Sequence, residues 1–365
     1  MKRNTKPVFA KDDTNEVFRR IKQQVNNTVS ALEPSRRINI TLKAILFPLL
    51  YLAAFTTALI YGKNPLLFFA SYCIMGIMLV IIFLNLIHEA VHHTLFRRKW
   101  LNEAYIYFFD LMGANSYTWK IRHTRLHHNY PNIMGWDSDI EQSTLARIFP
   151  HGKYNLIHRY QHIYLPVLYP LFLLNWLLIR DFKDYFNRKK LVWKVTQIPR
   201  QEYVKLFLFK LFFLFYIIVL PKLVLDVSWL TVTSAFLVMI FTASIIALLV
   251  LISPHANTEN EFPLPGEDNH MQRSWFLHQL YNTNDVKEDN WVTRFFMGCF
   301  NYHIAHHLFP HVHHVFYPEV TKIIKEETTK NNLPYRSYPL LTTLHNHYKL
   351  LKHNRMPENI FEETM

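Results

Sequence analysis

Four long apolar runs restrict the fold of this 365-residue chain more than any other feature. They cover residues 42–61, 66–87, 204–225 and 229–252, and each can span a hydrocarbon core of about 30 Å at ~1.5 Å rise per residue. Buried helices of a large soluble protein are the alternative, but they do not explain why the runs fall in two close pairs. The sequence therefore predicts an all-α membrane protein with four transmembrane helices in two hairpins.

The charged residues lie mostly outside these runs. Lysine and arginine gather in residues 1–41, 88–203 and 253–365, whereas the two hairpin turns hold few charges. Because positive residues favour the cytoplasmic side of a membrane, we expect a multi-pass protein with both termini and the long middle segment in the cytoplasm. The formal net charge of +13 is dispersed beside the apolar runs, which favours contact with membrane lipids and argues against nucleic acid as a partner.

This topology divides the chain into three parts. We expect a cytoplasmic N-terminal segment over residues 1–41, a membrane domain with a helical cytoplasmic cap over residues 42–335, and a cytoplasmic C-terminal tail over residues 336–365. Two apolar and aromatic stretches, residues 104–112 and 163–179, are expected either to lie at the membrane interface or to pack on the cytoplasmic cap.

Three histidine boxes and one single histidine stand near the ends of the apolar runs. Residues 88–93 read H-E-A-V-H-H, residues 123–128 read H-T-R-L-H-H, residues 303–307 read H-I-A-H-H, and His255 follows the last run. The predicted topology places all four on the cytoplasmic side.

Helical spacing predicts how the histidines of each box are arranged. Residues i and i+4 of a helix share a face, so His88 and His92 should lie side by side. The same spacing places His123 beside His127, with His128 on an adjacent face. The third box is an i, i+3, i+4 triplet. Because neighbouring histidines on one helix point in different directions, such a pair can serve two metals.

The number of histidines indicates the kind of site. Neutral imidazole suits iron, zinc, copper and nickel, and one zinc needs three or four ligands. The boxes together with His255 offer about twice that number, which favours a two-metal centre in the cap. A lone histidine is more often structural, and this interpretation holds for His151, His158, His162, His270, His345, His347 and His353. The histidines at positions 311, 313 and 314 are interpreted as surface or supporting groups.

Two other classes of function were weighed against this one. The first box also matches H-E-x-x-H, in which two histidines bind zinc and the glutamate is a general base, as in a membrane zinc metalloprotease. That hypothesis leaves the other boxes unexplained. A metal transporter or storage protein should carry ionisable groups inside its membrane runs, and these runs hold very few, notably Lys210.

Taken together, the boxes resemble those of the integral-membrane fatty acid desaturases and their hydroxylase relatives. That family shows H-x(3–4)-H, then H-x(2–3)-H-H, then (H/Q)-x(2–3)-H-H, in order, on two membrane hairpins, and all three boxes match. The resemblance covers roughly residues 40–335 and includes the flanking stretches 127–139, 160–164, 255–263, 275–279 and 301–310.

The resemblance implies an oxidoreductase of lipid metabolism that uses O2 and two iron ions to insert a double bond into a fatty acyl chain. The implied iron ligands are His88, His92, His123, His127, His128, His255, His303, His306 and His307, with no catalytic residue beyond them. Supporting positions around them are His93, Glu89, Asp137 and His278. The substrate would be an acyl-CoA or an acyl-lipid, whose chain enters an apolar tunnel while its headgroup stays at the basic cytoplasmic surface.

The sequence departs from this family in two respects. Members that insert double bonds near the carboxyl end usually have glutamine where His303 stands and often glutamate where Ala305 stands. Many also carry a fused haem domain with a His-Pro-Gly-Gly motif, which this sequence does not contain. The resemblance therefore implies a separate electron donor, such as ferredoxin or a b-type cytochrome with its reductase. Since hydroxylation shares the iron–oxygen step, a fatty acid or carotenoid hydroxylase of the same superfamily stays an alternative.

Overall fold

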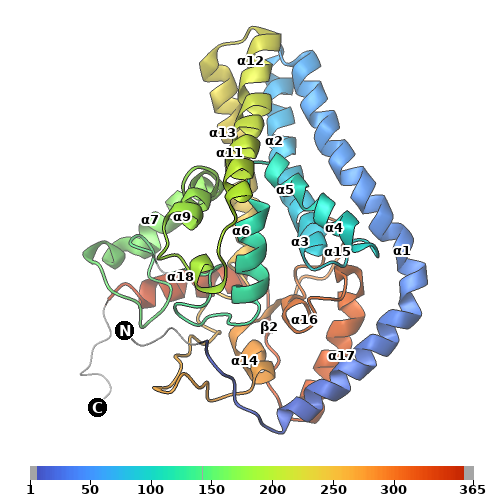
Figure 1. Ribbon diagram of the computed structural model, residues 1–365, viewed down its shortest axis with the longest axis vertical. Coiled ribbons are helices and arrows are strands. Elements are labelled where there is room, and N and C mark those ends of the chain that lie inside the picture. The colour runs from blue at the N-terminus through green and yellow to red at the C-terminus, as the bar shows by residue number, and fades with distance from the viewer. Residues whose placement is uncertain (1–5, 142, 357–365) are drawn as a thin grey trace.

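The structure is a computed structural model that describes residues 6–141 and 143–356. Over these residues the fold is helical, with one small parallel sheet formed by β1 (Asp285–Val286) and β2 (Ser337–Tyr338). Figure 1 shows two regions: a bundle of long helices at one end and a cap of shorter helices at the other.

Two helical hairpins build the bundle. They consist of α1 (Thr14–Tyr61), α2 (Pro65–Ile82), α11 (Arg200–Leu214), the π-helical turn η6 (Phe215–Val219), α12 (Leu220–Leu225) and α13 (Trp229–Leu251). Local sequence sets both turns. The Asn64 side chain accepts from the first backbone N–H groups of α2, which begins with a proline, and Ser228 caps α13 in the same way.

The four apolar runs are confirmed as parts of long helices. Within residues 6–141 and 143–356, five segments are long and apolar enough to cross a membrane: Thr14–Tyr61, Pro65–Val91, Leu156–Phe186, Arg200–Leu225 and Trp229–Leu251. The sequence predicted four such spans. The additional candidate contains the stretch 163–179, which was expected at the membrane interface or on the cap. In Figure 1 its helices α7 and α9 run across the direction of the bundle helices.

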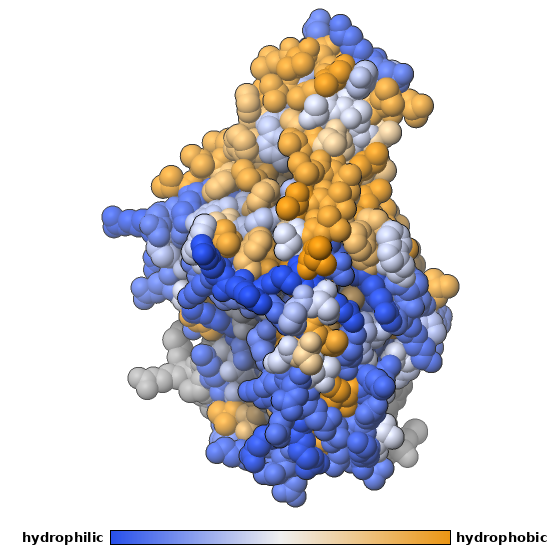
Figure 2. All heavy atoms as spheres, turned by 90° about the vertical axis from the view of Figure 1, so that its right-hand side faces the viewer, coloured by the Kyte–Doolittle hydropathy of each residue, from blue (hydrophilic) through white to orange (hydrophobic). Residues whose placement is uncertain are grey.

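The bundle is packed tightly inside and apolar outside. At Gly76 of α2 an added Cβ would lie 2.4 Å from the carbonyl oxygen of Met239 on α13, so glycine permits this close crossing. Outward-facing side chains such as Leu66, Leu211 and Leu230 are more than half exposed. Figure 2 shows the resulting apolar surface over the bundle and a hydrophilic surface over the cap. Apolar surface of this extent is typical of a membrane protein.

The cap contains the remaining helices. Its α-helices are α3 (His88–Val91), α4 (Lys99–Tyr105), α5 (Tyr107–Leu111), α6 (Ser116–Ile121), α7 (Gln161–Leu168), α8 (Phe172–Asn175), α9 (Asp181–Phe186), α10 (Val192–Val195), α14 (Trp275–Asn282), α15 (Trp291–Phe295), α16 (His303–Leu308), α17 (Tyr317–Lys330) and α18 (Leu340–His353). Single turns of π or 3₁₀ helix join them: η1 (Phe83–Ile87), η2 (Arg122–His127), η3 (Leu156–Tyr160), η4 (Tyr169–Leu171), η5 (Trp176–Arg180) and η7 (His314–Phe316).

Helix α1 connects the cap to the bundle. Residues 1–41 were predicted as a cytoplasmic segment and residues 42–61 as a membrane span. One continuous helix, Thr14–Tyr61, contains most of the first and all of the second. Val17, Ile21 and Val25 repeat every four residues and form one buried stripe, which packs in the same cluster as Val320 and Ile324 of α17. This packing fixes α17, and the neighbouring α16, beneath the end of the first hairpin (Figure 1).

Candidate metal centre

The first histidine box continues directly from α2. The π-helical turn η1 leads into α3, and the backbone N–H of His92 donates to the carbonyl of His88 at 3.4 Å. Their ring centroids lie 5.0 Å apart, so the prediction that these two histidines lie side by side is confirmed. His93 has a φ of +59° and is exposed, because the helix ends at this point.

The second box is wound as a π-helix, and this changes which histidines share a face. The backbone N–H of His128 donates to the carbonyl of His123, five residues earlier, at 3.1 Å. The wider turn aligns i with i+5. Their Nε2 atoms are 3.1 Å apart, whereas His127 joins a different group. The prediction that His123 lies beside His127 is confirmed, with ring centroids 5.7 Å apart, but the π-helix groups the ligand atoms of His123 with those of His128 and not with those of His127.

The third box is α-helical and behaves as its spacing predicts. His303 and His307, four residues apart in α16, lie together, and His306 points elsewhere. His255, beyond the end of α13, approaches His303 with 2.8 Å between their Nε2 atoms.

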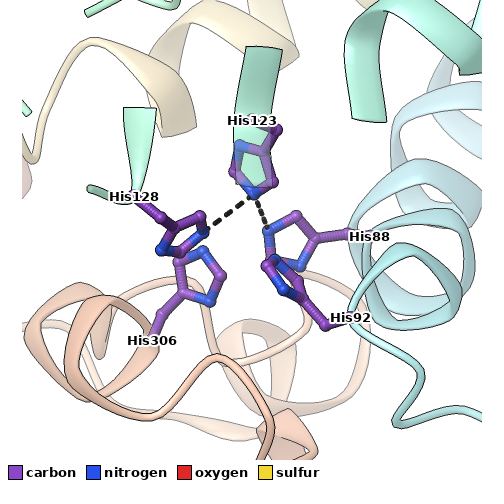
Figure 3. Close-up of side chains that lie close together, drawn as sticks. All are labelled: His88, His92, His123, His128 and His306. Atoms are coloured by element: carbon purple, nitrogen blue, oxygen red, sulfur yellow. Dashed lines mark hydrogen bonds between the residues drawn. The ribbon is translucent and has the colours of Figure 1, made fainter. Parts of the chain in front are cut away.

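The nine histidines form two groups in which the candidate ligand atoms lie within 4.8 Å of one another. The first cluster is His88, His92, His123, His128 and His306, and the second cluster is His127, His255, His303 and His307. Figure 3 shows the first cluster, whose five side chains point toward a common centre from three separate segments. In boxes two and three, one histidine of each adjacent pair belongs to the first cluster and the other to the second cluster. This is expected of neighbouring residues that point in different directions from one helix.

The inward-facing nitrogens are arranged as metal ligands would be. The Nε2 atom of His123 is 3.1 Å from the Nε2 atoms of both His88 and His128. The Nε2 atoms of His92, His306 and His307 are buried and have no hydrogen-bond partner. Buried polar atoms normally have partners, so these unpaired nitrogens, two in the first cluster and one in the second, indicate that each cluster is a site for a cation.

The outward-facing nitrogens are held by acceptors. Nδ1 contacts an oxygen at 3.0–3.2 Å in five cases: His123 to Asp139, His127 to Asp137, His255 to the carbonyl of Asn282, His306 to the Tyr317 hydroxyl and His307 to Gln279 Oε1. An acceptor at Nδ1 keeps the proton there and leaves the Nε2 lone pair facing inward.

Only one of these acceptors, Asp137, was singled out from the sequence. Its carboxylate also accepts from the backbone N–H groups of Asn132 and Asp139, at 2.8 and 2.9 Å, which folds the loop after the second box. Asp139 stands two residues further on and offered the same signal. Tyr317 stands 11 residues after His306 and Gln279 stands 28 residues before His307, and neither was singled out from the sequence as a supporting group.

Burial sets the protonation of the centre. Burial and the neighbouring imidazoles lower the pKa of His123, His128 and His306 well below the ordinary value, and burial lowers that of His255 to about 3. His127 differs, because the Asp137 carboxylate outweighs burial and raises its pKa. Neutral imidazole is the form that binds metal, so most of the site needs no proton release.

A third buried group surrounds Glu89. His314 Nδ1 lies 3.2 Å and His313 Nε2 3.8 Å from the Glu89 carboxylate, and Lys43 Nζ lies 3.2 Å from His314 Nε2. The Glu89 carboxylate is also 3.7 Å from Nδ1 of His88. Glu89 was predicted as a supporting position, whereas His313 and His314 were interpreted as surface or supporting groups. Both histidines are buried.

The last supporting candidate, His278, touches no histidine of either cluster directly. Its Nε2 lies 2.9 Å from the carbonyl of Pro131 and 3.1 Å from the side-chain nitrogen of Asn282. Since the Asn282 carbonyl faces His255, His278 acts on the second cluster through that residue.

A cavity of about 230 Å³ adjoins both clusters. Six histidines line this histidine-lined cavity, five from the two clusters and His347, together with apolar residues such as Phe83, Trp176 and Phe300 and with polar residues Glu141 and Arg180. It shares Phe83, Phe172, Trp176 and Leu251 with a second, apolar pocket of about 60 Å³ between the bundle helices, here called the end pocket. Five of the nine clustered histidines thus line one side of a continuous apolar space.

The sequence model of the fatty acid desaturase family matches residues 29–339. The chain belongs to this family. It is 29% identical to the sn-1 linoleoyl-lipid 6-desaturase of Arthrospira platensis, over 74% of this chain and 73% of that protein. It is 28% identical to the acyl-lipid (8-3)-desaturase of Physcomitrium patens, over 94% of this chain and 72% of that protein.

A third relative is the Delta(5) fatty acid desaturase A of Dictyostelium discoideum, 28% identical over 70% of this chain and 55% of that protein. All three relatives are named as desaturases, so the prediction of a fatty acid desaturase, an oxidoreductase of lipid metabolism, is confirmed. The family membership and the histidine clusters account for each other, because desaturases of this kind carry three histidine boxes.

Proposed function

We propose that the two clusters hold two iron ions and that the desaturase inserts a double bond into the acyl chain of a membrane lipid, with O2 as co-substrate. The proposed ligands are His88, His92, His123, His128 and His306 for one iron and His127, His255, His303 and His307 for the other. The observation that carries this assignment is the convergence of Nε2 atoms at 2.8–3.1 Å with Nδ1 atoms anchored outside.

These separations favour iron over tetrahedral zinc. With metal–nitrogen bonds of about 2.1 Å, ligands at right angles lie about 3.0 Å apart, and ligands at the tetrahedral angle lie about 3.4 Å apart. The measured values of 3.1, 3.1 and 2.8 Å fit right angles. The first cluster also offers five imidazoles, one more than a tetrahedral zinc site accepts.

Bound iron would supply the O2 chemistry that removes hydrogen from an unactivated methylene, which no side chain performs alone. The two hydrogens leave the acyl chain as the double bond forms, and O2 is reduced to water with two further electrons and protons. The residues of the chain position the reaction. Asp137, Asp139, Gln279 and Tyr317 hold the imidazoles, and the apolar walls keep the chain beside them and exclude water.

The cavities support an acyl chain as the substrate. The histidine-lined cavity would hold the methylenes that react, and the end pocket would take the methyl end. In the end pocket Gly113 faces Phe213, and an added Cβ at Gly113 would lie 2.6 Å from that ring. The space between the histidines and this closed end would decide which carbons react. The relatives named above act at different positions, and His303 stands where glutamine is usual in enzymes that act near the carboxyl end.

We further propose the topology that the sequence predicted. Four spans form two hairpins, the segment Leu156–Phe186 lies at the membrane interface, and the cap with the iron site is cytoplasmic. The segment Leu156–Phe186 runs across the bundle in Figure 1 and contains two prolines, Pro166 and Pro170. Both features favour an interfacial position. The boundaries proposed for the three parts are residues 1–41, 42–335 and 336–365.

Electrons would come from a separate protein, a ferredoxin or a b-type cytochrome with its reductase. Among the nine proposed ligands only His92 is not fully buried, and it precedes the exposed His93. This side of the first cluster therefore lies nearest to water, and we place electron transfer there.

The proposal is tested by expressing the chain in a host that lacks its own desaturase. We expect new unsaturated acyl chains in the membrane lipids, identified by mass spectrometry, and two irons per purified chain. A hydroxylated product would favour the hydroxylase alternative. One zinc per chain, with no change in the acyl chains, would contradict the proposal and favour a metalloprotease.

A further inference from the structure

A third cavity, of about 340 Å³, lies at the side of the molecule, outside the metal centre. We call it the lateral groove. Pro166 and Pro170 line it on one side, Leu249 of α13 on another, and Leu344 and Leu351 of α18 on the third. Its walls are almost entirely apolar, and they come from three segments that are distant in sequence.

The lateral groove adjoins the histidine-lined cavity. Four residues line both spaces: Tyr169, Leu248, Ile252 and His347. A molecule that passed these four side chains would move from the side of the protein to the histidine clusters without crossing the hydrophilic surface of the cap.

The outer end of the lateral groove meets the apolar surface of the bundle. Ile245 and Leu249 lie on α13, one of the helices long enough to cross a membrane, and they are 48% and 38% exposed. Val167, on the neighbouring α7, is 74% exposed. Apolar side chains this exposed at the end of a membrane helix are covered by lipid chains, so the groove opens toward lipid rather than water.

A hydrogen-bonded pair closes the inner end. Nδ1 of His347 donates to the carbonyl of Ala256 at 2.6 Å, which leaves its Nε2 to accept from the hydroxyl of Tyr169 at 2.5 Å. Ala256 directly follows His255 of the second cluster. The contact joins α18 to η4 across the junction of the two spaces, and breaking it would separate those two segments.

We propose that the lateral groove is a portal through which an acyl chain of a membrane lipid passes from the bilayer to the histidine clusters, with Tyr169 and His347 as its latch. The inference rests on the proposed function and adds the route and the form of the substrate. A chain that takes this route stays in apolar surroundings throughout, and each methylene kept from water favours it. A lipid can leave its headgroup at the membrane interface meanwhile.

The main test narrows the groove without touching the clusters. Leu344→Trp adds bulk to the groove wall from α18, and Leu341→Trp adds the same bulk at a position of α18 that is 79% exposed and does not line the groove. Both full-length variants are placed in vesicles of saturated phosphatidylcholine with the electron donor. The quantity measured is the half-saturating lipid fraction, the fraction of phosphatidylcholine at which the reaction rate is half of its maximum. We expect Leu344→Trp to raise this fraction several-fold with unchanged iron content. We expect Leu341→Trp to behave as the wild type.

A second variant tests the hydrogen bond between Tyr169 and His347. It also provides a result if Leu344→Trp does not fold. Tyr169→Phe retains the ring but removes the hydroxyl. Because a net hydrogen bond is equivalent to roughly a fivefold change in an equilibrium, we expect the half-saturating lipid fraction to fall by about that factor. A half-saturating fraction equal to that of the wild type in both variants would overturn the portal.

A photoreactive benzoylphenylalanine at position 344 should be attached to the vesicle lipid after illumination, and one at position 341 should give much less product. Attachment of added acyl-CoA in place of the lipid would overturn the inference. These results are separate from the proposed function: if the wild type forms no double bond in any acyl substrate, that function fails, whereas double bonds formed with an unlabelled groove refute only the portal.

Discussion

The first cluster is larger and more open than the second. It contains five histidines, and one of them, His92, is only partly buried, whereas all four of the second cluster are buried. Three of the four in the second cluster have an acceptor at Nδ1, but in the first only His123 and His306 have one within 3.2 Å. The second cluster is thus the more rigidly built, and the first is less completely buried, at His92.

This difference teaches how one helical segment serves two sites. His127 and His128 are neighbours, yet one belongs to each cluster, and the same is true of His306 and His307. The segments that carry the boxes therefore fix the distance between the clusters, while separate acceptors fix each imidazole. Loss of a proposed ligand should abolish metal binding in one cluster, whereas loss of an acceptor should only weaken metal binding in that cluster.

The largest effect is expected from His306→Ala. It removes an imidazole from the first cluster and leaves the second cluster intact, so we expect desaturation to be abolished and the iron content to fall from two to one per chain. Lipid analysis and metal analysis measure the two effects. His311→Ala, at an exposed histidine of the following segment, is the control. Full activity in His306→Ala would contradict the ligand assignment.

The two aspartates that hold imidazoles allow the clusters to be compared directly. Asp137→Asn acts on His127 of the second cluster, and Asp139→Asn acts on His123 of the first. Loss of such an acceptor typically weakens metal binding by about 10–100-fold. We expect the larger loss for Asp137, which is fully buried and also orders its own loop, in an iron titration of the metal-free enzyme. Equal losses would show that rigidity does not distinguish the clusters.

A smaller effect is expected from Glu89→Gln. The change removes a buried negative charge that faces His88, His313 and His314, and so it loosens the support of the first cluster alone. We expect iron to bind the first cluster up to about tenfold more weakly, with the second cluster unchanged. Glu103→Gln, at an exposed position of α4, is the control, and a loss shared by both clusters would refute this selective role.

The smallest expected effect is a loss of stability at low pH, and buried histidines beside both clusters should contribute to it. Burial lowers the pKa of His314, beside the first cluster, and of His278, behind the second, to about 4 in each case. An unfolded histidine titrates near pH 6.5, so between about pH 6.5 and pH 4 the unfolded chain binds more protons than the folded one. The stability of the metal-free enzyme is therefore complete above that window and falls as the pH falls through it.

Thermal unfolding at about pH 7 and about pH 5 measures this loss. His278→Gln should make the dependence on pH less steep, and His345→Gln, at an exposed histidine of α18, should leave it unchanged. A variant at position 278 as sensitive to acid as the wild type would show that its burial does not contribute.

Much of the site was predictable, because its signals are local. The nine histidines and Asp137 stand in short motifs, and the helical period correctly placed His88 with His92 and separated His306 from His307. It did not group His123 with His128, because the backbone of η2 is a π-helix and a few residues of sequence do not reveal the wider turn. It also passed over Gln279 and Tyr317, whose roles depend on segments that meet only in the folded chain.

The sequence by itself determined the apolar helices, the hairpin turns, the histidine boxes and the family, because hydropathy, capping and helical period act over a few neighbouring residues. Tertiary structure alone decided which histidines share a cluster, which oxygens hold them, and that His347 lies at the junction between the lateral groove and the histidine-lined cavity. The reason is physical: these contacts join residues far apart in sequence, 178 positions in the case of Tyr169 and His347, and packing of the whole chain brings them together.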